Sequence, residues 1–305
     1  MEKLADVRTR MRSVSGIGEV CRTLATVASA KLAQTHERAR GARVYTAALR
    51  NILVRQQRAA LVGGTDPATL SPLMASRAEV HKVTVLVIGA DRGLCGGHNL
   101  ALGRAARAFI LERTGMGIDV SAIVKGRRAE TYLRRTTSVP MLEATAWTRA
   151  GVNDSEVSTL LTQSTDAFLG GEVDEVWACY TAFHSTMRRE PAVVRLLPVT
   201  PEESVAGAQE ALPGAWNYEP AMQPCVQELL EAFVRLQIED VLLESFASEQ
   251  AARMVTMQEA SERADRSLAT LRVHYNRLRR ESITADLVGV LVAGRVRKEA
   301  ESNAD

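Results

Sequence analysis

The stretch MVTMQEASERADRSLATLRVHYNRL, from Met254 to Leu278, decides the fold class of this 305-residue chain. Its apolar and small residues return at alternating steps of three and four, the spacing of a seam between two packed helices. The stretch lies within Cys225–Val288, a run without proline or glycine, which predicts a continuous helix on the order of 96 Å long. So long a helix needs a partner to cover its apolar side.

The partner is predicted at the other end of the chain. The same spacing runs from Leu4 to Leu32, and its second half consists of small residues that allow another helix to approach closely. We predict one helix from about residue 3 to about residue 60, broken by Gly63-Gly64 and Asp66-Pro67. Residues 1–60 carry twelve basic and four acidic side chains, and residues 225–305 carry eleven basic and fourteen acidic ones. These opposite charges suit two helices that lie side by side as an antiparallel coiled coil.

The middle of the chain, which holds all nine prolines, changes to the pattern of an α/β domain. Short apolar runs rich in β-branched residues at 83–90, 119–126 and 173–183 predict buried parallel strands, and segments 98–113, 127–135 and 154–169 predict helices. The fold class is therefore α/β plus a long antiparallel coiled coil. Its predicted parts are an N-terminal coiled-coil helix at 1–62, a small Rossmann-like α/β domain at 78–205 and a C-terminal coiled-coil helix at 210–305.

Composition argues against several classes of function. A formal charge of +2 makes a nucleic-acid binder that works by bulk charge improbable. The N-terminal segment has no apolar core, so it predicts no signal peptide, and no stretch is apolar enough for direct insertion in a membrane. Four scattered cysteines predict reduced thiols, and the histidines never fall at metal-ligand spacing, so we predict no metal and no cofactor. These residues are Cys21, Cys95, Cys179, Cys225, His36, His81, His98, His184 and His274.

The most site-like feature is the glycine-rich loop Gly89–His98, which lies between a predicted strand and a predicted helix. Phosphate-binding loops occupy that position, but this loop has neither GK[ST] nor GxGxxG. A nucleotide site, a tight structural turn and a protein-contact loop all remain open. The first of these would make the chain a nucleotide-binding α/β enzyme with a coiled-coil dimerisation arm.

Two further groups have a chemical and a structural interpretation. Cys95 beside His98 could be a thiolate nucleophile, although no third orienting group or oxyanion hole can be named, or simply a small side chain in a crowded turn. His184 and Glu190 flank two arginines, and there we expect a loop of exposed charges. No residue is predicted to be catalytic.

Several motifs in a fixed order resemble one family over nearly the whole chain. They are Ala28-Ser-Ala-Lys-Leu32, Asp91-Arg-Gly-Leu-Cys-Gly-Gly97, Leu196-Leu-Pro198, Tyr218-Glu-Pro220, Leu243-Glu-Ser-Phe-Ala-Ser-Glu-Gln-Ala-Ala-Arg-Met254, and Tyr275-Asn-Arg277 followed by Ile283-Thr284. The sequence in this respect resembles the gamma subunit of the rotary F-type ATP synthase.

The resemblance implies that the coiled coil is a central rotor shaft inside a hexamer of three alpha and three beta subunits, with the active sites on the beta subunits. It implies coupling of ion flow through a ring of c subunits to ATP synthesis or hydrolysis, contact with an epsilon subunit, and a peripheral place on the cytoplasmic face of the cell membrane. The chain itself would be no enzyme.

The resemblance also assigns partner contacts to individual residues. Ile283, Thr284 and Leu287 match the shaft tip that the hexamer surrounds, and Arg8, Arg12 and Ser13 match the start of the opening helix in the same region. The loop expected near beta or epsilon comprises Asp91, Arg92, Gly93, Leu94, Cys95, Gly96 and Gly97.

The chain departs from the family pattern near both ends. Gly16-Ile-Gly-Glu-Val20 replaces a Lys/Thr/Gln-rich stretch, and Gly289 and Gly294 lie in the closing segment. Because glycine weakens a helix, we expect these four glycines to interrupt the two helices. We interpret the departures as the mark of a divergent or second-copy gamma subunit.

Overall fold

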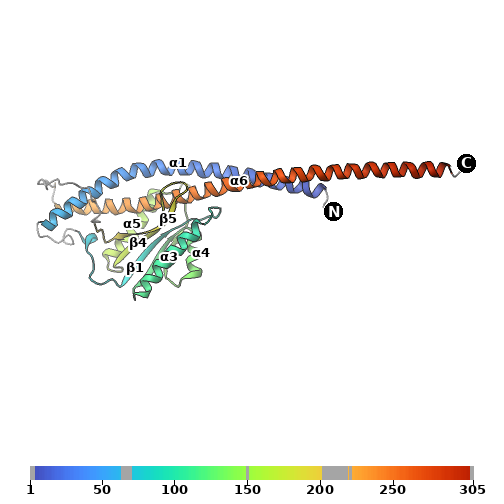
Figure 1. The fold of residues 1–305 in the computed structure, drawn as a ribbon. Coiled ribbons are helices and arrows are strands. Elements are labelled where there is room, and N and C mark those ends of the chain that lie inside the picture. The colour runs from blue at the N-terminus through green and yellow to red at the C-terminus, as the bar shows by residue number, and fades with distance from the viewer. Residues whose placement is uncertain (1–3, 63–70, 149–150, 201–218, 220–221, 303–305) are drawn as a thin grey trace. The chain divides into compact units, whose positions relative to one another are not determined.

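Two long helices and a five-stranded sheet make up the fold (Figure 1). The computed structural model describes residues 4–62, 71–148, 151–200, 219 and 222–302. Helix α1 spans Leu4–Val62 and helix α6 spans Met222–Ser302, so both predicted long helices are confirmed. The break predicted at residues 63–67, the start of the last segment at 210 and most of the 218–220 motif lie outside the described residues.

The chain divides into two compact units, and each is described by itself. The first consists of the α1 end up to Val27 and the α6 end from Thr256 onward. The second runs from Ala28 to Val255 and contains the sheet.

The first unit is an antiparallel helix pair along the predicted seam. Cys21 and Ala25 of α1 are buried against Met257 of α6. The Ser261 hydroxyl donates to the Gly18 carbonyl oxygen at 3.3 Å, and Arg22 forms an ion pair of 3.1 Å with Asp265 between the oppositely charged helices. From Arg279 to Val292, by contrast, every side chain of α6 is exposed.

The glycines do not interrupt the helices, so that prediction is wrong. Helix α1 continues through Gly16 and Gly18, and α6 continues through Gly289 and Gly294. One glycine weakens a helix by only about 1 kcal/mol relative to alanine. Helices of 59 and 81 residues tolerate that loss, because each further residue adds a backbone hydrogen bond to a helix already formed.

The second unit contains the predicted α/β elements. Strands β1 (Lys82–Ile88), β2 (Asp119–Lys125) and β4 (Glu175–Phe183) match the three predicted strands. Helices α3 (His98–Gly115), α4 (Arg127–Thr136) and α5 (Asp154–Leu169) match the three predicted helices. A short 3-10 turn, η1 (Pro72–Met74), precedes the sheet.

Two strands at the sheet edges were not predicted. Strand β3 (Met141–Thr145) has no buried apolar face, and β5 (Arg189–Leu197) opens with charged residues and Pro191. The sheet order is β3-β2-β1-β4-β5, in which the first four strands are parallel and β5 is antiparallel to β4. The prediction of a charged loop through Glu190 is therefore wrong at its end, because Arg189 already pairs with Phe183.

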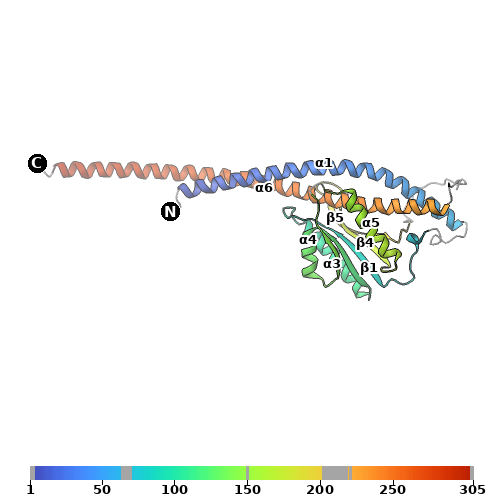
Figure 2. The same cartoon turned by 180° about the vertical axis from the view of Figure 1, so that it is seen from behind.

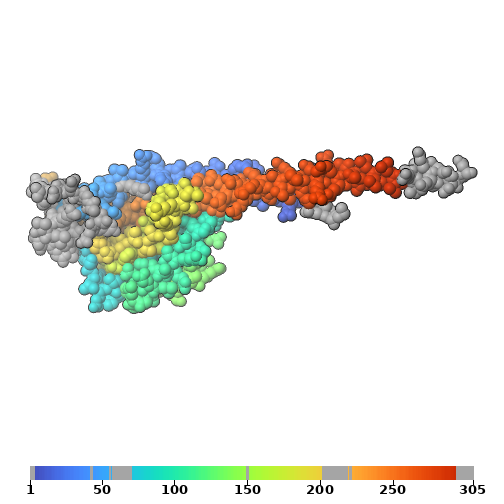
Figure 3. Space-filling model, viewed as in Figure 1, coloured from blue at the N-terminus to red at the C-terminus, as the bar shows by residue number. Residues whose placement is uncertain are grey.

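Helices cover both faces of the sheet (Figures 1 and 2). Val85 of β1 belongs to the core shared with α3 and α4, and Leu86, its neighbour, belongs to the core shared with α5, α1 and α6. Figure 3 shows the surface of α3 beside that of the β4–β5 edge. Helix α6 is thus an integral part of the α/β core.

Candidate functional site

The loop between β1 and α3, residues 89–97, is tied to two neighbouring connections by Asp91. One carboxylate oxygen accepts the N–H of Arg127 at 3.0 Å, and the other accepts the N–H of Trp147 at 2.8 Å. Arg127 is the first residue of α4. At this position a carboxylate accepts a hydrogen bond from a backbone N–H that has no partner within the helix, and its negative charge interacts favourably with the helix dipole. Asp91 therefore organises the carboxyl ends of β1, β2 and β3 into one rigid edge.

Two glycines let the connections after β1 and β2 cross closely. Gly126 has a φ of +102°, and a Cβ at this position would lie 2.3 Å from the Gly89 carbonyl oxygen. No other residue type fits both the left-handed backbone and the contact. At Gly126 the glycine signal therefore reflects backbone packing between two loops. At Gly89 it reflects the close approach of α4, because a Cβ there would lie 2.7 Å from the Cβ of Ala129.

The tip of the loop exposes an apolar side chain on strained backbone. Leu94 has a φ of +64° and its side chain is 61% exposed, next to the exposed Arg92. A left-handed leucine costs about 1–2 kcal/mol, and burial of the side chain does not offset that cost here. Strain of this kind clusters at functional sites.

Cys95 and His98 lack the electrostatics of a nucleophilic pair. The Cys95 thiol is 2% exposed and accepts the Asn99 amide at 3.1 Å, and burial, helped by the charge of Glu249, raises its pKa. Burial, with Arg189 and Arg253 adding to it, lowers the pKa of His98 to about 4. A reactive thiolate needs a lowered pKa, so Cys95 is a small side chain in a crowded turn.

The crevice where doubly wound folds bind nucleotides is filled by α6. It lies at the carboxyl ends of β1 and β4, where the strand order reverses. There the Ser245 hydroxyl donates to the Ile88 carbonyl oxygen at 2.7 Å, and the Ser248 hydroxyl donates to the Thr181 carbonyl oxygen at 2.9 Å. Both serines are buried, so the crevice is a docking site for a helix of the same chain.

A buried ion pair beneath the loop was missed by sequence reasoning. Arg253 and Glu249 of α6 lie 2.6 Å apart, and Arg253 Nη2 lies 3.5 Å from the Gly93 carbonyl oxygen. Burial raises the pKa of Glu249. The positive charge of Arg253 partly opposes this shift, and the negative charge of Asp91 adds to it. The available signal was the four-residue spacing of Glu249 and Arg253 within the motif Leu243–Met254, which predicts an ion pair on one face of the helix. This spacing does not show that the pair lies against the loop at residues 89–97.

The six residues matched to the shaft tip all lie in the first unit, and all are exposed. The structure does not bring the two groups opposite each other. Because the antiparallel register sets Gly18 beside Ala264, Arg8 lies near position 274 of α6, short of Ile283. Thr284 donates its hydroxyl to the Arg280 carbonyl oxygen of its own helix.

Within the described ranges, no three His, Cys, Asp or Glu side chains gather as a metal site requires. None of the helices in this part of the chain is both long and apolar enough to cross a membrane. All four cysteines are free thiols.

Fold and site together define a protein with two long helices, one of which, α6, packs on an α/β body and fills its nucleotide crevice. A family model described as ATP synthase matches residues 3–294. ATP synthase gamma chains are similar over most of their length. The gamma chain of Geotalea daltonii is 34% identical, and the match covers 95% of this chain and 97% of the relative. The gamma chain of Cupriavidus necator is also 34% identical, and the match covers 92% of this chain and 95% of the relative.

The chain therefore belongs to the ATP synthase gamma chain family, whose members are the non-catalytic central rotor shaft of the rotary ATP synthase. The fold agrees with a chain from the central stalk and c-ring of the Tetrahymena thermophila mitochondrial ATP synthase. The TM-score is 0.57 and the identity 20%, over 79% of this chain and 99% of that one. A chain from the rotor of the Euglena gracilis mitochondrial ATP synthase gives a TM-score of 0.57 at 14% identity, and the match covers 92% of this chain and 98% of that one. A nucleotide-binding enzyme is not favoured.

Proposed function

We propose that this chain carries torque between a membrane ring of c subunits and a hexamer of three alpha and three beta subunits. In this proposal the helix pair turns inside the hexamer, and the α/β domain holds epsilon and rests on the ring. The complex lies on the cytoplasmic face of the cell membrane, with this chain as a peripheral subunit. The division into 1–62, 78–205 and 210–305 supplies the parts of such a rotor.

The observation that carries the proposal is an uncovered apolar stripe on α6. Ile283, Leu287 and Val290 are 49%, 60% and 71% exposed. They repeat the four-three step of the seam after a shift of one position. An apolar stripe on a long helix calls for an external cover. A surrounding sleeve of subunits suits it, because apolar contacts have no fixed direction and allow the helix to turn.

The loop with Leu94 at its tip supplies the second contact in this proposal. Its exposed Arg92 is of a residue type that is enriched at protein interfaces, and the exposed Leu94 beside it offers an apolar contact. Residues 91–97 are therefore assigned to contact beta or epsilon, with Asp91 and Cys95 holding the loop rigid from within.

Substitution of the stripe tests the proposal. We expect Ile283→Ser with Leu287→Ser to lower ATP synthesis by the complex in sealed vesicles several-fold, because the shaft tip loses its apolar contact. The matched control is Val273→Ser, which changes a residue of the same helix that is 71% exposed and should leave synthesis unchanged. Truncation after Arg280 should have the larger effect, and unchanged synthesis after truncation would refute the role of the tip.

Purification tests the partners. The chain should be recovered with alpha and beta in a one-to-three-to-three complex, and recovery of the chain alone would refute the rotor proposal. The enzyme alternative predicts instead that ATP, ADP or NAD raises the melting temperature of the isolated chain.

A further inference from the structure

Trp147, which follows β3, joins the loop at residues 91–97 to helix α6. Its indole N–H donates to the Gly89 carbonyl oxygen at 2.6 Å, and its backbone N–H donates to a carboxylate oxygen of Asp91 at 2.8 Å. Its ring also lies 5.3 Å from the ring of Phe246 in α6, centroid to centroid. One residue therefore touches both the base of the loop and the helix that fills the crevice.

A buried ion pair holds the ring of Trp147 in place. Lys125, the last residue of β2, is 3% exposed. Its ammonium group lies 5.4 Å from the centre of the Trp147 ring, and it donates to the Ala146 carbonyl oxygen at 2.7 Å and to Glu156 of α5 at 2.8 Å. An ammonium group over an aromatic face attracts the ring, and the bond to Glu156 fixes the ammonium group itself. The indole is thus constrained by β2, α5 and α6 together.

A second connection between the loop and α6 is longer. Arg253 Nη2 lies 3.5 Å from the Gly93 carbonyl oxygen, at the limit of a hydrogen bond. Between these two connections the backbone of Leu94 is left-handed, and such strain persists only where the surrounding structure holds it. The bond from Trp147 to Gly89 is the stronger of the two connections, because it is much shorter.

We propose that Trp147 is the positioning residue for the partner contact of this loop. It holds Gly89 and packs on Phe246, and in this way it keeps the exposed Leu94 in one place relative to α6. A force that a partner exerts on the loop then reaches α6, and it is not lost in movement of the loop. This inference rests on the proposed contact of residues 91–97 with beta or epsilon.

Trp177 of β4 is a closely matched control. Its indole N–H donates to Glu175 at 2.7 Å, its ring lies 5.3 Å from that of Phe109, and the Arg113 guanidinium lies 4.9 Å from its ring centre. Trp177 is also half-buried, as Trp147 is. Replacement of either tryptophan by phenylalanine therefore removes one indole hydrogen bond and leaves a ring of similar kind.

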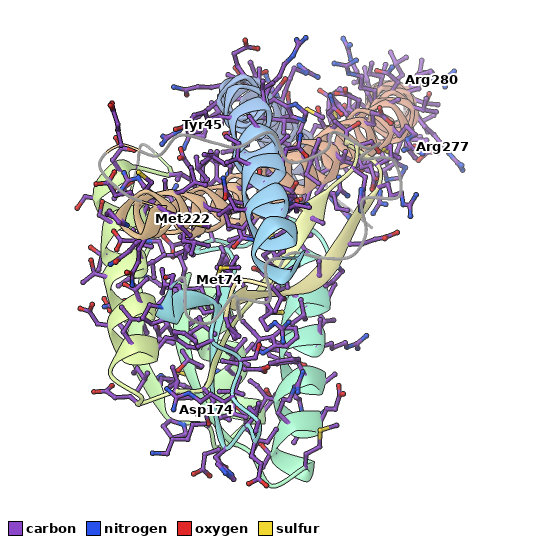
Figure 4. All side chains as sticks on the ribbon, turned by 90° about the vertical axis from the view of Figure 1, so that its left-hand side faces the viewer. Tyr45, Met74, Asp174, Met222, Arg277 and Arg280 are labelled. Atoms are coloured by element: carbon purple, nitrogen blue, oxygen red, sulfur yellow. The ribbon has the colours of Figure 1, made fainter. Side chains whose placement is uncertain are left out.

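The control lies toward the opposite end of the sheet. Trp177 pairs with Val85 of β1, four residues before Gly89, which is about 13 Å along a strand. Figure 4 shows Asp174, the residue just before β4, at the edge of the sheet remote from α6. Trp177→Phe therefore leaves the base of the loop at residues 91–97 untouched.

Alkylation of the native thiols in the purified full chain measures how often the loop opens. Cys95 in the loop is 2% exposed, so iodoacetamide reaches it only when the loop opens, whereas Cys179 within β4 is 0% exposed and reports opening of the sheet. We expect Trp147→Phe to speed labelling of Cys95 about tenfold, the change in equilibrium constant that the loss of one hydrogen bond produces. Labelling of Cys179 should change little. Trp177→Phe should label Cys95 at the wild-type rate.

The same two variants test the contact in the assembled complex. ATP synthesis in sealed vesicles, measured per assembled complex, should fall several-fold in Trp147→Phe and stay at the wild-type value in Trp177→Phe. Three results would overturn the inference: an unchanged rate at Cys95 in Trp147→Phe, an equal rise at Cys95 and Cys179, or unchanged synthesis despite faster labelling of Cys95.

Failure of the proposed function gives a different result. The chain would then not be recovered with alpha and beta, while the labelling of the isolated chain would still distinguish Trp147→Phe from Trp177→Phe. That result would refute the partner contact and would leave only the attachment of the loop to α6.

Discussion

Gly16 and Gly18 in the N-terminal part of α1 give a sharp test of the helix pair. Gly18 lies at its closest approach: a Cβ there would be 3.2 Å from the Cβ of Ala264, and the Gly18 carbonyl accepts the Ser261 hydroxyl. A Cβ on Gly16 would meet nothing within 4 Å. The same substitution, glycine to alanine, should therefore have opposite effects two residues apart.

The magnitude follows from three contributions. Alanine favours the helix by about 1 kcal/mol at either position. At Gly16 this gain stands alone, so Gly16→Ala should raise the free energy of unfolding by up to about 1 kcal/mol. At Gly18 the new methyl group must push the helices apart, which costs about 1–3 kcal/mol, and the Ser261 hydrogen bond, about 1 kcal/mol, weakens. Gly18→Ala should thus lower the free energy of unfolding by about 1–2 kcal/mol.

Hydrogen exchange measures the change where it occurs, because local opening free energies are resolved along the chain. Amides of the seam around Cys21 and Met257 should exchange faster in Gly18→Ala and slower in Gly16→Ala. Equal stabilisation by the two variants would refute the close approach at Gly18. A difference of about 2–3 kcal/mol is large enough to separate the two outcomes.

Two further predictions concern the second unit. Folding lowers the pKa of His98 from 6.5 to about 4, so between these pH values the unfolded chain binds a proton that the folded chain does not. The contribution of neutral His98 to the free energy of unfolding is therefore lost as the pH falls from about 6.5 to 4. Arg189 and Arg253 face His98 and add to this effect. Between pH 7 and pH 4 the free energy of unfolding in urea should fall by roughly 3 kcal/mol more in the wild type than in His98→Leu. The same pH dependence in both proteins would contradict this. Ser248→Ala should lower the free energy of unfolding by about 1–3 kcal/mol and speed hydrogen exchange at the β4 end of the sheet, because the Thr181 carbonyl loses its donor. The control is Ser267→Ala on the exposed side of α6, which should change the free energy of unfolding little.

Elements with a strong period were predicted well, and elements without one were missed. The long helices and the three central strands follow from proline distribution, three-four spacing and β-branched runs. Strand β3 alternates half-buried and exposed residues, and β5 carries a proline that only an edge strand tolerates. Nothing local distinguishes such edge strands from loops, because their pairing comes from a neighbour distant in sequence.

The candidate site shows the same division. The glycine-rich loop could be found from the sequence, but its role could not. Gly126 is explained by a crossing of two loops and Gly89 by the close approach of α4, and both contacts join segments that are distant in sequence.

By itself, the sequence determined that this chain forms two long helices around an α/β domain, because helix period and proline exclusion are local properties of the chain. Only the tertiary structure decided what fills the nucleotide crevice. Ser245 and Ser248 reach the sheet through contacts 157 and 67 residues away in sequence, and local sequence patterns do not contain such distances.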